Sequence, residues 1–224
     1  MAYAVKEIYY TIQGEGAQAG RGAVFLRFAG CNLWSGREED RATAACNFCD
    51  TNFVGTDGPG GGKFETADEL AQAVREKWPV AAGFDTSPSR SAAWLDSGPL
   101  VVCTGGEPLL QLDAELIFAL HEIGFVIAVE TNGTLPAPPG IDWLCVSPKT
   151  AADLAITAGD ELKLVYPQPD LDPASFLQLS FRYFYLQPLD DAHAAANLQR
   201  TVDYCLAHPP WRLSLQTHKL LGLP

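Results

Sequence analysis

The chain alternates short apolar runs, rich in branched and aromatic residues, with stretches of helical periodicity. The runs predicted as strands are residues 5–12, 23–28, 100–104, 125–130, 141–147, 162–166, 183–187 and 211–216. The predicted helices are residues 70–78, 112–123 and 192–208. Strands that alternate with helices form a parallel sheet covered by its crossover helices. Because the helices thin out after residue 130, we expect an α/β fold with mostly parallel strands, arranged as an incomplete (opened) β/α barrel.

The length of 224 residues fits one domain, and we expect a single domain over residues 1–224. Two segments look irregular. Residues 55–62 contain five glycines, but the run GPGGGKF over residues 58–64 lacks the spacing and the hydroxyl residue of a nucleotide phosphate loop. Residues 81–98 are rich in Ser, Ala, Pro and Gly, and we expect a surface loop without chemistry there.

Composition narrows the classes of partner. The formal net charge is -12 and no block of Lys or Arg is present, which opposes binding to nucleic acid or to an anionic membrane surface. No apolar run approaches the roughly 18 residues of a membrane span, and the first residues lack the pattern of a secretory signal. We therefore expect a cytoplasmic protein that acts on a small molecule, with its six cysteines reduced.

Three of these cysteines are grouped. Cys31, Cys46 and Cys49 are spaced C-x14-C-x2-C, with the aromatic Phe48 directly before the last. A structural zinc site and an ordinary [4Fe-4S] site each want four ligands, so three suggest a metal centre with one open position. A zinc site completed by a distant ligand remains an alternative. The other three cysteines lie in apolar runs and are predicted to be small buried side chains: Cys103, Cys145 and Cys205.

Several motifs together resemble a known superfamily. They are QGEG (13–16), RFAGCNLW (27–34), CDT (49–51), TGGEP (104–108), ETNG (130–133) and SPK (147–149). With the cysteines they resemble the radical S-adenosylmethionine (SAM) superfamily, whose common pattern is C-x3-C-x-aromatic-C. The first spacer is stretched here to fourteen residues, and with this feature the chain looks like the 7-carboxy-7-deazaguanine synthase family.

The resemblance implies a chemistry. Three thiolates hold three irons of a [4Fe-4S] cluster, SAM chelates the fourth iron, and an electron from an external, flavodoxin-like reductant splits SAM into methionine and a 5′-deoxyadenosyl radical. The substrate is 6-carboxy-5,6,7,8-tetrahydropterin, rearranged by ring contraction with loss of ammonia to 7-carboxy-7-deazaguanine, a precursor in queuosine and 7-deazapurine biosynthesis. Mg²⁺ assists, and the family suggests a homodimer. The enzyme would be a carbon–nitrogen lyase.

The resemblance also implies the site residues, with no catalytic side chain beyond the cluster and SAM. The cluster ligands are Cys31, Cys46 and Cys49, and the Mg²⁺ ligand is Thr51. The residues expected to contact SAM are Phe48, Cys49, Asp50, Gly106, Ser147, Pro148, Lys149, Gln187, Pro188, Leu189 and Asp190. The residues expected to contact the pterin are Ile12, Gln13, Gly14, Arg27, Thr104, His218 and Pro224, the last through a terminal carboxylate.

Physical arguments bear on two of these residues. Arg27 shares a strand face with Phe25 and Ala29, and an arginine among apolar neighbours needs a partner, either a bidentate substrate carboxylate or a structural salt bridge. Near Pro224 the sequence LLGL carries three leucines, and we expect this segment to pack against the body of the protein. Alternative functions are another radical SAM enzyme, acting on a carbon skeleton or activating a protein, and a zinc-binding interaction module.

Overall fold

The computed structural model describes residues 2–79, 92–150 and 154–224. The chain divides into two compact units, each built from several stretches of sequence. Unit 1 comprises Met1–Thr11, Arg21–Thr131 and Ala137–Trp143, and unit 2 comprises Ile12–Gly20, Asn132–Pro136 and Leu144–Pro224. We predicted that residues 1–224 fold cooperatively as a single domain. The division into two compact units does not test cooperative folding, so this stays a prediction.

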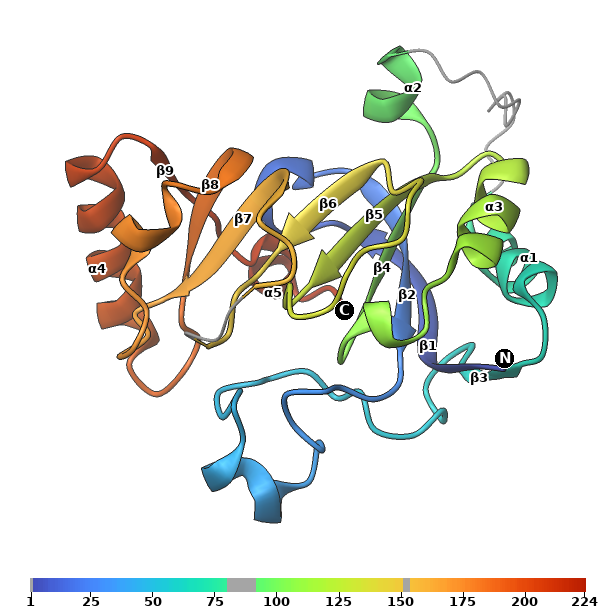
Figure 1. Ribbon diagram of the computed structural model, residues 1–224, viewed down its shortest axis with the longest axis horizontal. Coiled ribbons are helices and arrows are strands. Elements are labelled where there is room, and N and C mark those ends of the chain that lie inside the picture. The colour runs from blue at the N-terminus through green and yellow to red at the C-terminus, as the bar shows by residue number, and fades with distance from the viewer. Residues whose placement is uncertain (1, 80–91, 151–153) are drawn as a thin grey trace. The chain divides into compact units, whose positions relative to one another are not determined.

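Unit 1 contains the first five strands. They are β1 (Tyr3–Ile12), β2 (Gly22–Phe28), β3 (Gly62–Phe64), β4 (Leu100–Gly105) and β5 (Val126–Thr131), in the spatial order β3-β1-β2-β4-β5. Pairs β2–β4 and β4–β5 are parallel, and β1–β3 is antiparallel. Helices α1 (Ala67–Lys77) and α3 (Ala114–Glu122) lie side by side next to these strands (Figure 1). The short elements are η2 (Glu38–Thr43), α2 (Ala92–Ser97) and η3 (Pro108–Leu110).

Unit 2 contains a second run of parallel strands. Strands β6 (Trp143–Val146), β7 (Ala158–Tyr166), β8 (Ser180–Pro188) and β9 (Trp211–Leu213) pair in sequence order, each parallel to the next. Helix α4 (Ala194–Ala207) packs against β8 and β9. The remaining elements are η1 (Gly16–Gln18), η4 (Pro173–Phe176) and α5 (Thr217–Leu221).

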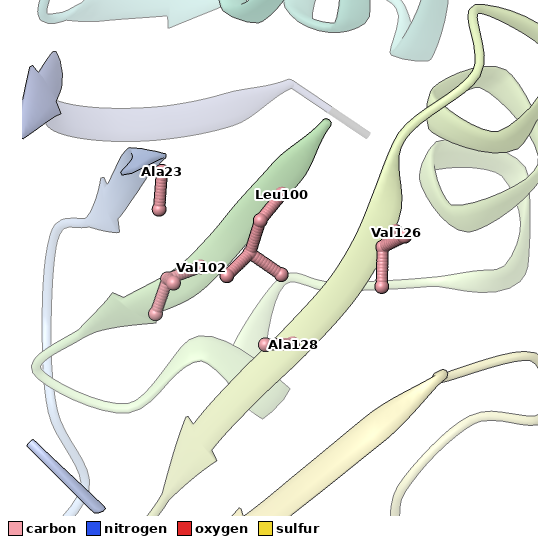
Figure 2. Close-up of a cluster of buried hydrophobic side chains, with 5 residues drawn as sticks. All are labelled: Ala23, Leu100, Val102, Val126 and Ala128. Carbon is pink, nitrogen blue, oxygen red and sulfur yellow. The ribbon is translucent and has the colours of Figure 1, made fainter. Parts of the chain in front are cut away.

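The core of unit 1 lies along three parallel strands. Ala23, Leu100, Val102, Val126 and Ala128 are all at most 3% exposed and come from β2, β4 and β5 (Figure 2). Phe25 and Trp143, both partly buried, pack against this cluster. This apolar layer fixes the register of the strands, since a one-residue slip would move every one of these side chains to the other face.

Most predicted elements are confirmed with shifted ends. The capping box at Thr66 and Glu69 is formed, with both side chains accepting backbone N–H donors. The helix predicted from residue 112 begins at Ala114, because Asp113 accepts the N–H of Leu116 and caps it. Gly124 ends it with a φ of 86°, a conformation that favours glycine.

Two expectations need correction. The predicted loop at residues 81–98 contains helix α2 at its end, and residues 81–91 of that prediction lie outside the described residues. Two of the three terminal leucines do not pack inward, since Leu220 is 76% and Leu221 62% exposed, whereas Leu223 is 37% exposed. Polar contacts hold α5 instead: Thr217 donates through its N–H and Oγ1 to the carbonyl oxygen of Gly14, each at 3.0 Å.

A search of the described residues finds no helix long and apolar enough to cross a membrane.

Candidate functional site

The cysteine loop follows strand β2 and is joined to the end of its neighbour β4. In the parallel pairing Arg27 stands opposite Thr104 and Phe28 opposite Gly105. Beyond the strands, the N–H of Gly106 donates to the carbonyl oxygen of Phe28 at 3.4 Å, and the N–H of Glu107 donates to that of Gly30 at 2.9 Å. A side chain at Gly106 would overlap the carbonyl of Gly30. Glycine there lets the two loops approach closely, as expected for a ligand-binding strand end.

The three grouped thiols differ in exposure. Cys46 is buried, whereas Cys31 and Cys49 are half-buried. The N–H of Leu33 donates to Sγ of Cys31 at 3.4 Å. Burial raises the pKa of the Cys31 thiol, and the charges of Glu107 and Cys49 add to this, against the lowering effect of backbone N–H donors. A bound cation would favour the thiolates that this environment otherwise opposes.

The donor set, three cysteine thiols on one loop, fits the thiolate ligands of an iron–sulfur cluster. The N–H donor to Sγ of Cys31 is also typical of such sites. A search of the described part of the chain finds no group of three or more His, Cys, Asp or Glu residues arranged to hold a metal ion. None of the six cysteines, all of which lie in the described residues, forms a disulfide. Of the other three, Cys103 and Cys145 are buried as predicted. The prediction for Cys205 is wrong, because this residue of helix α4 is half-buried.

Arg27 has partners within unit 1. Its Nε donates to Oε1 of Glu7 at 2.8 Å, and its Nη2 donates to the hydroxyl of Tyr9 at 2.9 Å. Burial lowers the pKa of Arg27, but Tyr9 and Glu7 outweigh this and raise it. The ring of Tyr9 stacks on that of Phe25 at 5.6 Å between centroids. The structural salt bridge is therefore present, and substrate binding by Arg27 stays a prediction.

The other predicted residues of unit 1 surround the cysteines in sequence. Phe48 and Thr51 are half-buried, and Asp50 is exposed. The carbonyl of Thr51 lies 3.9 Å from Sγ of Cys49, which donates to it. Their roles toward SAM and Mg²⁺ stay predictions.

Unit 2 brings together two segments predicted to contact the substrate. Gly14 lies against the ring of His218, which a Cβ at Gly14 would overlap. Gln13 is 5% exposed, and its Oε1 accepts the N–H of Glu15 at 3.1 Å. Ile12 is half-buried, while Pro224 is exposed. The packing of Gly14 on His218 explains why the glycine is needed and why His218 is not a freely moving surface side chain.

The residues of unit 2 predicted to contact SAM follow the ends of β6 and β8. Nζ of Lys149 donates to Oγ of Ser147 at 2.7 Å, with Pro148 between them. The N–H of Leu189, after Gln187 and Pro188, donates to the carbonyl oxygen of Tyr166 at the end of β7. Asp190 pairs with Lys219 at 2.6 Å on the surface. Both segments lie at carboxyl ends of parallel strands, where sites in such folds are built.

A buried polar network around Glu15 was missed by the sequence reasoning. The carboxylate accepts from Nζ of Lys163 and from the amides of Gln187, at 3.0 Å, and Gln216, at 2.9 Å. Burial raises the pKa of Glu15, but Lys163 outweighs it and lowers the pKa to about 2. The network ties the loop that carries Gln13 to strands β7 and β8. Its partners are far apart in sequence and carry no local signal.

Two further residues escaped notice. Glu107 is fully buried, and its Oε1 accepts from Oγ1 of Thr131 at 2.7 Å and from the N–H of Leu109 at 3.0 Å. It therefore holds the turn after β4 in shape. Arg41, within the spacer between the first two grouped cysteines, contacts the turn that carries the third. The motif TGGEP contains Glu107 and therefore indicated that residue. No local sequence pattern indicated Arg41.

Comparisons with known proteins identify the family of the chain. No family model matches the chain. A 7-carboxy-7-deazaguanine synthase from Caulobacter vibrioides is 60% identical, and one from Bordetella pertussis is 58% identical, each over all of both chains. The chain belongs to the 7-carboxy-7-deazaguanine synthase family. A relative of the same name from Bacteroides thetaiotaomicron is 39% identical over 98% of this chain and 97% of its own.

A solved structure shows the fold. The crystal structure of QueE from Escherichia coli matches with a TM-score of 0.67, covering 96% of this chain and 94% of that one at 24% identity. The predicted α/β fold, an opened β/α barrel of the radical SAM type, is confirmed. Family membership also confirms the predicted enzyme class and its cofactors, a [4Fe-4S] cluster, SAM and Mg²⁺.

Proposed function

We propose that this member of the 7-carboxy-7-deazaguanine synthase family converts 6-carboxy-5,6,7,8-tetrahydropterin to 7-carboxy-7-deazaguanine with loss of ammonia. The observation that carries the proposal is the cysteine loop. It leaves the end of β2 and is bonded at Gly30 to the glycine turn after β4. When bound, the cluster and SAM supply the radical that starts the rearrangement, and the protein supplies position and electrostatics.

The chain's own residues have three roles in this proposal. Cys31, Cys46 and Cys49 hold the cluster, and Thr51 offers one hydroxyl to Mg²⁺, which keeps waters or substrate oxygens for its other positions. The segments that contact SAM are residues 48–50, 147–149 and 187–190, together with Gly106. The pterin is bound by residues 12–14, Arg27, Thr104, His218 and Pro224.

Arg27 can serve the substrate while keeping its salt bridge. A guanidinium carries five N–H donors, and the contacts to Glu7 and Tyr9 run through Nε and Nη2. These contacts orient the planar group, which reduces the entropy that a substrate carboxylate must overcome on binding.

The setting of the reaction is part of the proposal. We expect a single cooperative domain that acts in the cytoplasm, where thiols stay reduced. The electron comes from an external one-electron reductant of the flavodoxin type, and the enzyme works as a homodimer on a small-molecule pterin, without nucleic acid or membrane.

The decisive experiment is anaerobic. The protein is reconstituted with iron and sulfide, and then incubated with SAM, reductant, Mg²⁺ and 6-carboxytetrahydropterin, followed by mass spectrometry. We expect 7-carboxy-7-deazaguanine, ammonia, methionine and 5′-deoxyadenosine. Cys31→Ala should take up less iron and form no product, whereas the matched control Cys205→Ala should behave as wild type. A fully loaded enzyme that cleaves SAM but leaves this pterin unchanged would point to another radical SAM reaction, and a colourless zinc protein to an interaction module.

A further inference from the structure

The fourteen-residue spacer between Cys31 and Cys46 folds back onto the other cysteines. It contains the 3₁₀ helix η2, drawn in light blue on the long loop that follows β2 in Figure 1. From this helix Arg41 reaches the Cys46-x2-Cys49 turn. Its Nη1 donates to the carbonyl oxygens of Asn47 and Cys49, each at 3.0 Å. One side chain from the spacer therefore holds two carbonyls of the turn that carries two thiols.

Arg41 is itself fixed from two further sides. Its Nε lies 2.7 Å from Oε1 and 2.9 Å from Oε2 of Glu38. Its guanidinium carbon lies 4.2 Å above the ring of Trp34, a distance typical of a cation–π contact. Glu38 is largely exposed, so this ion pair alone contributes little to stability. The contacts together restrict the guanidinium to one orientation, which is what directs it at the two carbonyls.

The contacts of Trp34 continue to the first cysteine. Trp34 is 8% exposed, and its ring packs edge-on against that of Phe53 at 5.6 Å between centroids. The carbonyl oxygen of Phe53 accepts the N–H of Gly30 at 3.2 Å, directly before Cys31. A chain of contacts therefore runs from the backbone beside Cys31, through Phe53, Trp34 and Arg41, to the backbone of Cys49. These contacts join the two ends of the cysteine loop, so the position of Cys31 depends on that of Cys49.

We propose that Arg41 is a positioning residue for the iron–sulfur cluster, holding the Cys46-x2-Cys49 turn in the shape in which its thiolates meet the metal together with Cys31. The inference rests on the proposed cluster. The required features are the planar fork, which serves Glu38 and the carbonyls at once, and the flat face that lies over Trp34. A lysine keeps the charge but has neither feature. Arg41 touches no iron in this proposal and acts through the backbone.

The test compares three variants with the wild-type protein. Arg41→Gln removes the fork, Arg41→Lys keeps the charge, and Arg37→Gln is the matched control in the same loop, since Arg37 is 73% exposed and its pair with Glu39 spans 3.7 Å. Each protein is reconstituted anaerobically, and the first-order rate of iron release to an excess of chelator is measured. Amide hydrogen exchange of residues 44–53 is measured on the same loaded proteins.

We expect Arg41→Gln to release iron about tenfold faster than wild type, the factor that about 1.4 kcal/mol produces. Arg41→Lys should release it at an intermediate rate, and Arg37→Gln at the wild-type rate. Faster exchange over residues 44–53 in Arg41→Gln should accompany the faster release. Because the side chain of Arg41 is partly exposed, the variant should fold, which circular dichroism checks.

The inference is overturned if Arg41→Gln and Arg37→Gln release iron at the same rate, or if faster release comes without faster exchange over residues 44–53. In either case a loaded wild type leaves the proposed function standing. A wild-type protein that takes up no cluster at all would instead refute the proposed function, and this inference with it.

Discussion

Replacing Lys163 with methionine should lower the free energy of unfolding by about 3–5 kcal/mol, because a buried carboxylate loses its cation. Nζ of Lys163 donates to Oε2 of Glu15, and the two side chains are only 4% and 15% exposed. Methionine keeps the length and the apolar stem, so the packing loss is small. The amides of Gln187 and Gln216 still donate to Glu15, but neither carries a charge.

Acid should narrow the difference between this variant and wild type. In the wild type, burial raises the pKa of Glu15 but Lys163 outweighs it, lowering the pKa from 4.5 to about 2. A carboxylate with a lowered folded pKa stabilises the fold above its unfolded pKa, and this contribution is lost as the pH falls from about 4.5 towards 2. A shift of this size corresponds to about 3 kcal/mol. In Lys163→Met, burial dominates and raises the pKa, so the contribution of this group improves as the pH falls.

The assay is guanidinium unfolding followed by tryptophan fluorescence, at neutral pH and near pH 4.5, in the same cluster state throughout. Lys219→Met is the matched control, because Lys219 pairs with Asp190 at 38% and 48% exposure and should cost less than about 1 kcal/mol. The double variant Glu15→Gln/Lys163→Met should recover part of the loss, since it removes the stranded charge.

Two results would refute this reasoning. The first is a cost for Lys163→Met no greater than that for Lys219→Met. The second is a difference between Lys163→Met and wild type that stays constant between the two pH values, because a buried unpaired carboxylate cannot be indifferent to protonation.

Three further predictions concern the candidate site. Thr51→Ala should weaken the Mg²⁺ dependence and raise the KM for the pterin while leaving iron content unchanged, and identical kinetics across a Mg²⁺ titration would remove Thr51 from the site. Arg27→Lys should weaken substrate binding by about 1.5–3 kcal/mol through loss of the fork, measured by calorimetry; a change in stability alone would leave Arg27 as the structural partner of Glu7. Gly106→Ala should lower iron retention, because its Cβ would overlap the carbonyl of Gly30; iron content and chelator resistance equal to wild type would contradict this.

The sheet was largely predictable because its signal is local. Buried parallel strands read as continuous apolar runs, and all the long strands of both units were located this way. The three-residue strand β3 was missed: Gly62–Phe64 has no apolar run, and its pairing with β1 decides its structure. Helix α5 was missed for the same reason, since contacts of Thr217 with Gly14 hold it rather than its leucines.

The candidate site likewise has residues that could be predicted from local sequence patterns and contacts that could not. The spacing of Cys31, Cys46 and Cys49 is a local signal, and glycines before Glu107 mark the close approach of two loops. The sequence predicted that Arg27 needs a carboxylate partner. It did not identify Glu7 as that partner, because Glu7 lies on another strand. The pair of Glu15 with Lys163 joins residues 148 positions apart, and no single-sequence pattern indicates such a contact.

The long spacer shows how a contact inside the loop can offset the entropic cost of closing it. Lengthening a flexible spacer from three residues to fourteen costs about 1.3 kcal/mol of extra loop-closure entropy, since each doubling of length costs about 0.6 kcal/mol. A hydrogen bond contributes about 0.5–1.5 kcal/mol net, so the two bonds from Arg41 to the carbonyls of Asn47 and Cys49 are of the size needed to offset it. A spacer of this length without such an internal contact should hold its thiols less firmly. The fourteen-residue spacer loosens the loop that carries the thiols, and Arg41 restrains it again. The rate of iron release therefore tests whether Arg41 offsets the cost of the long spacer.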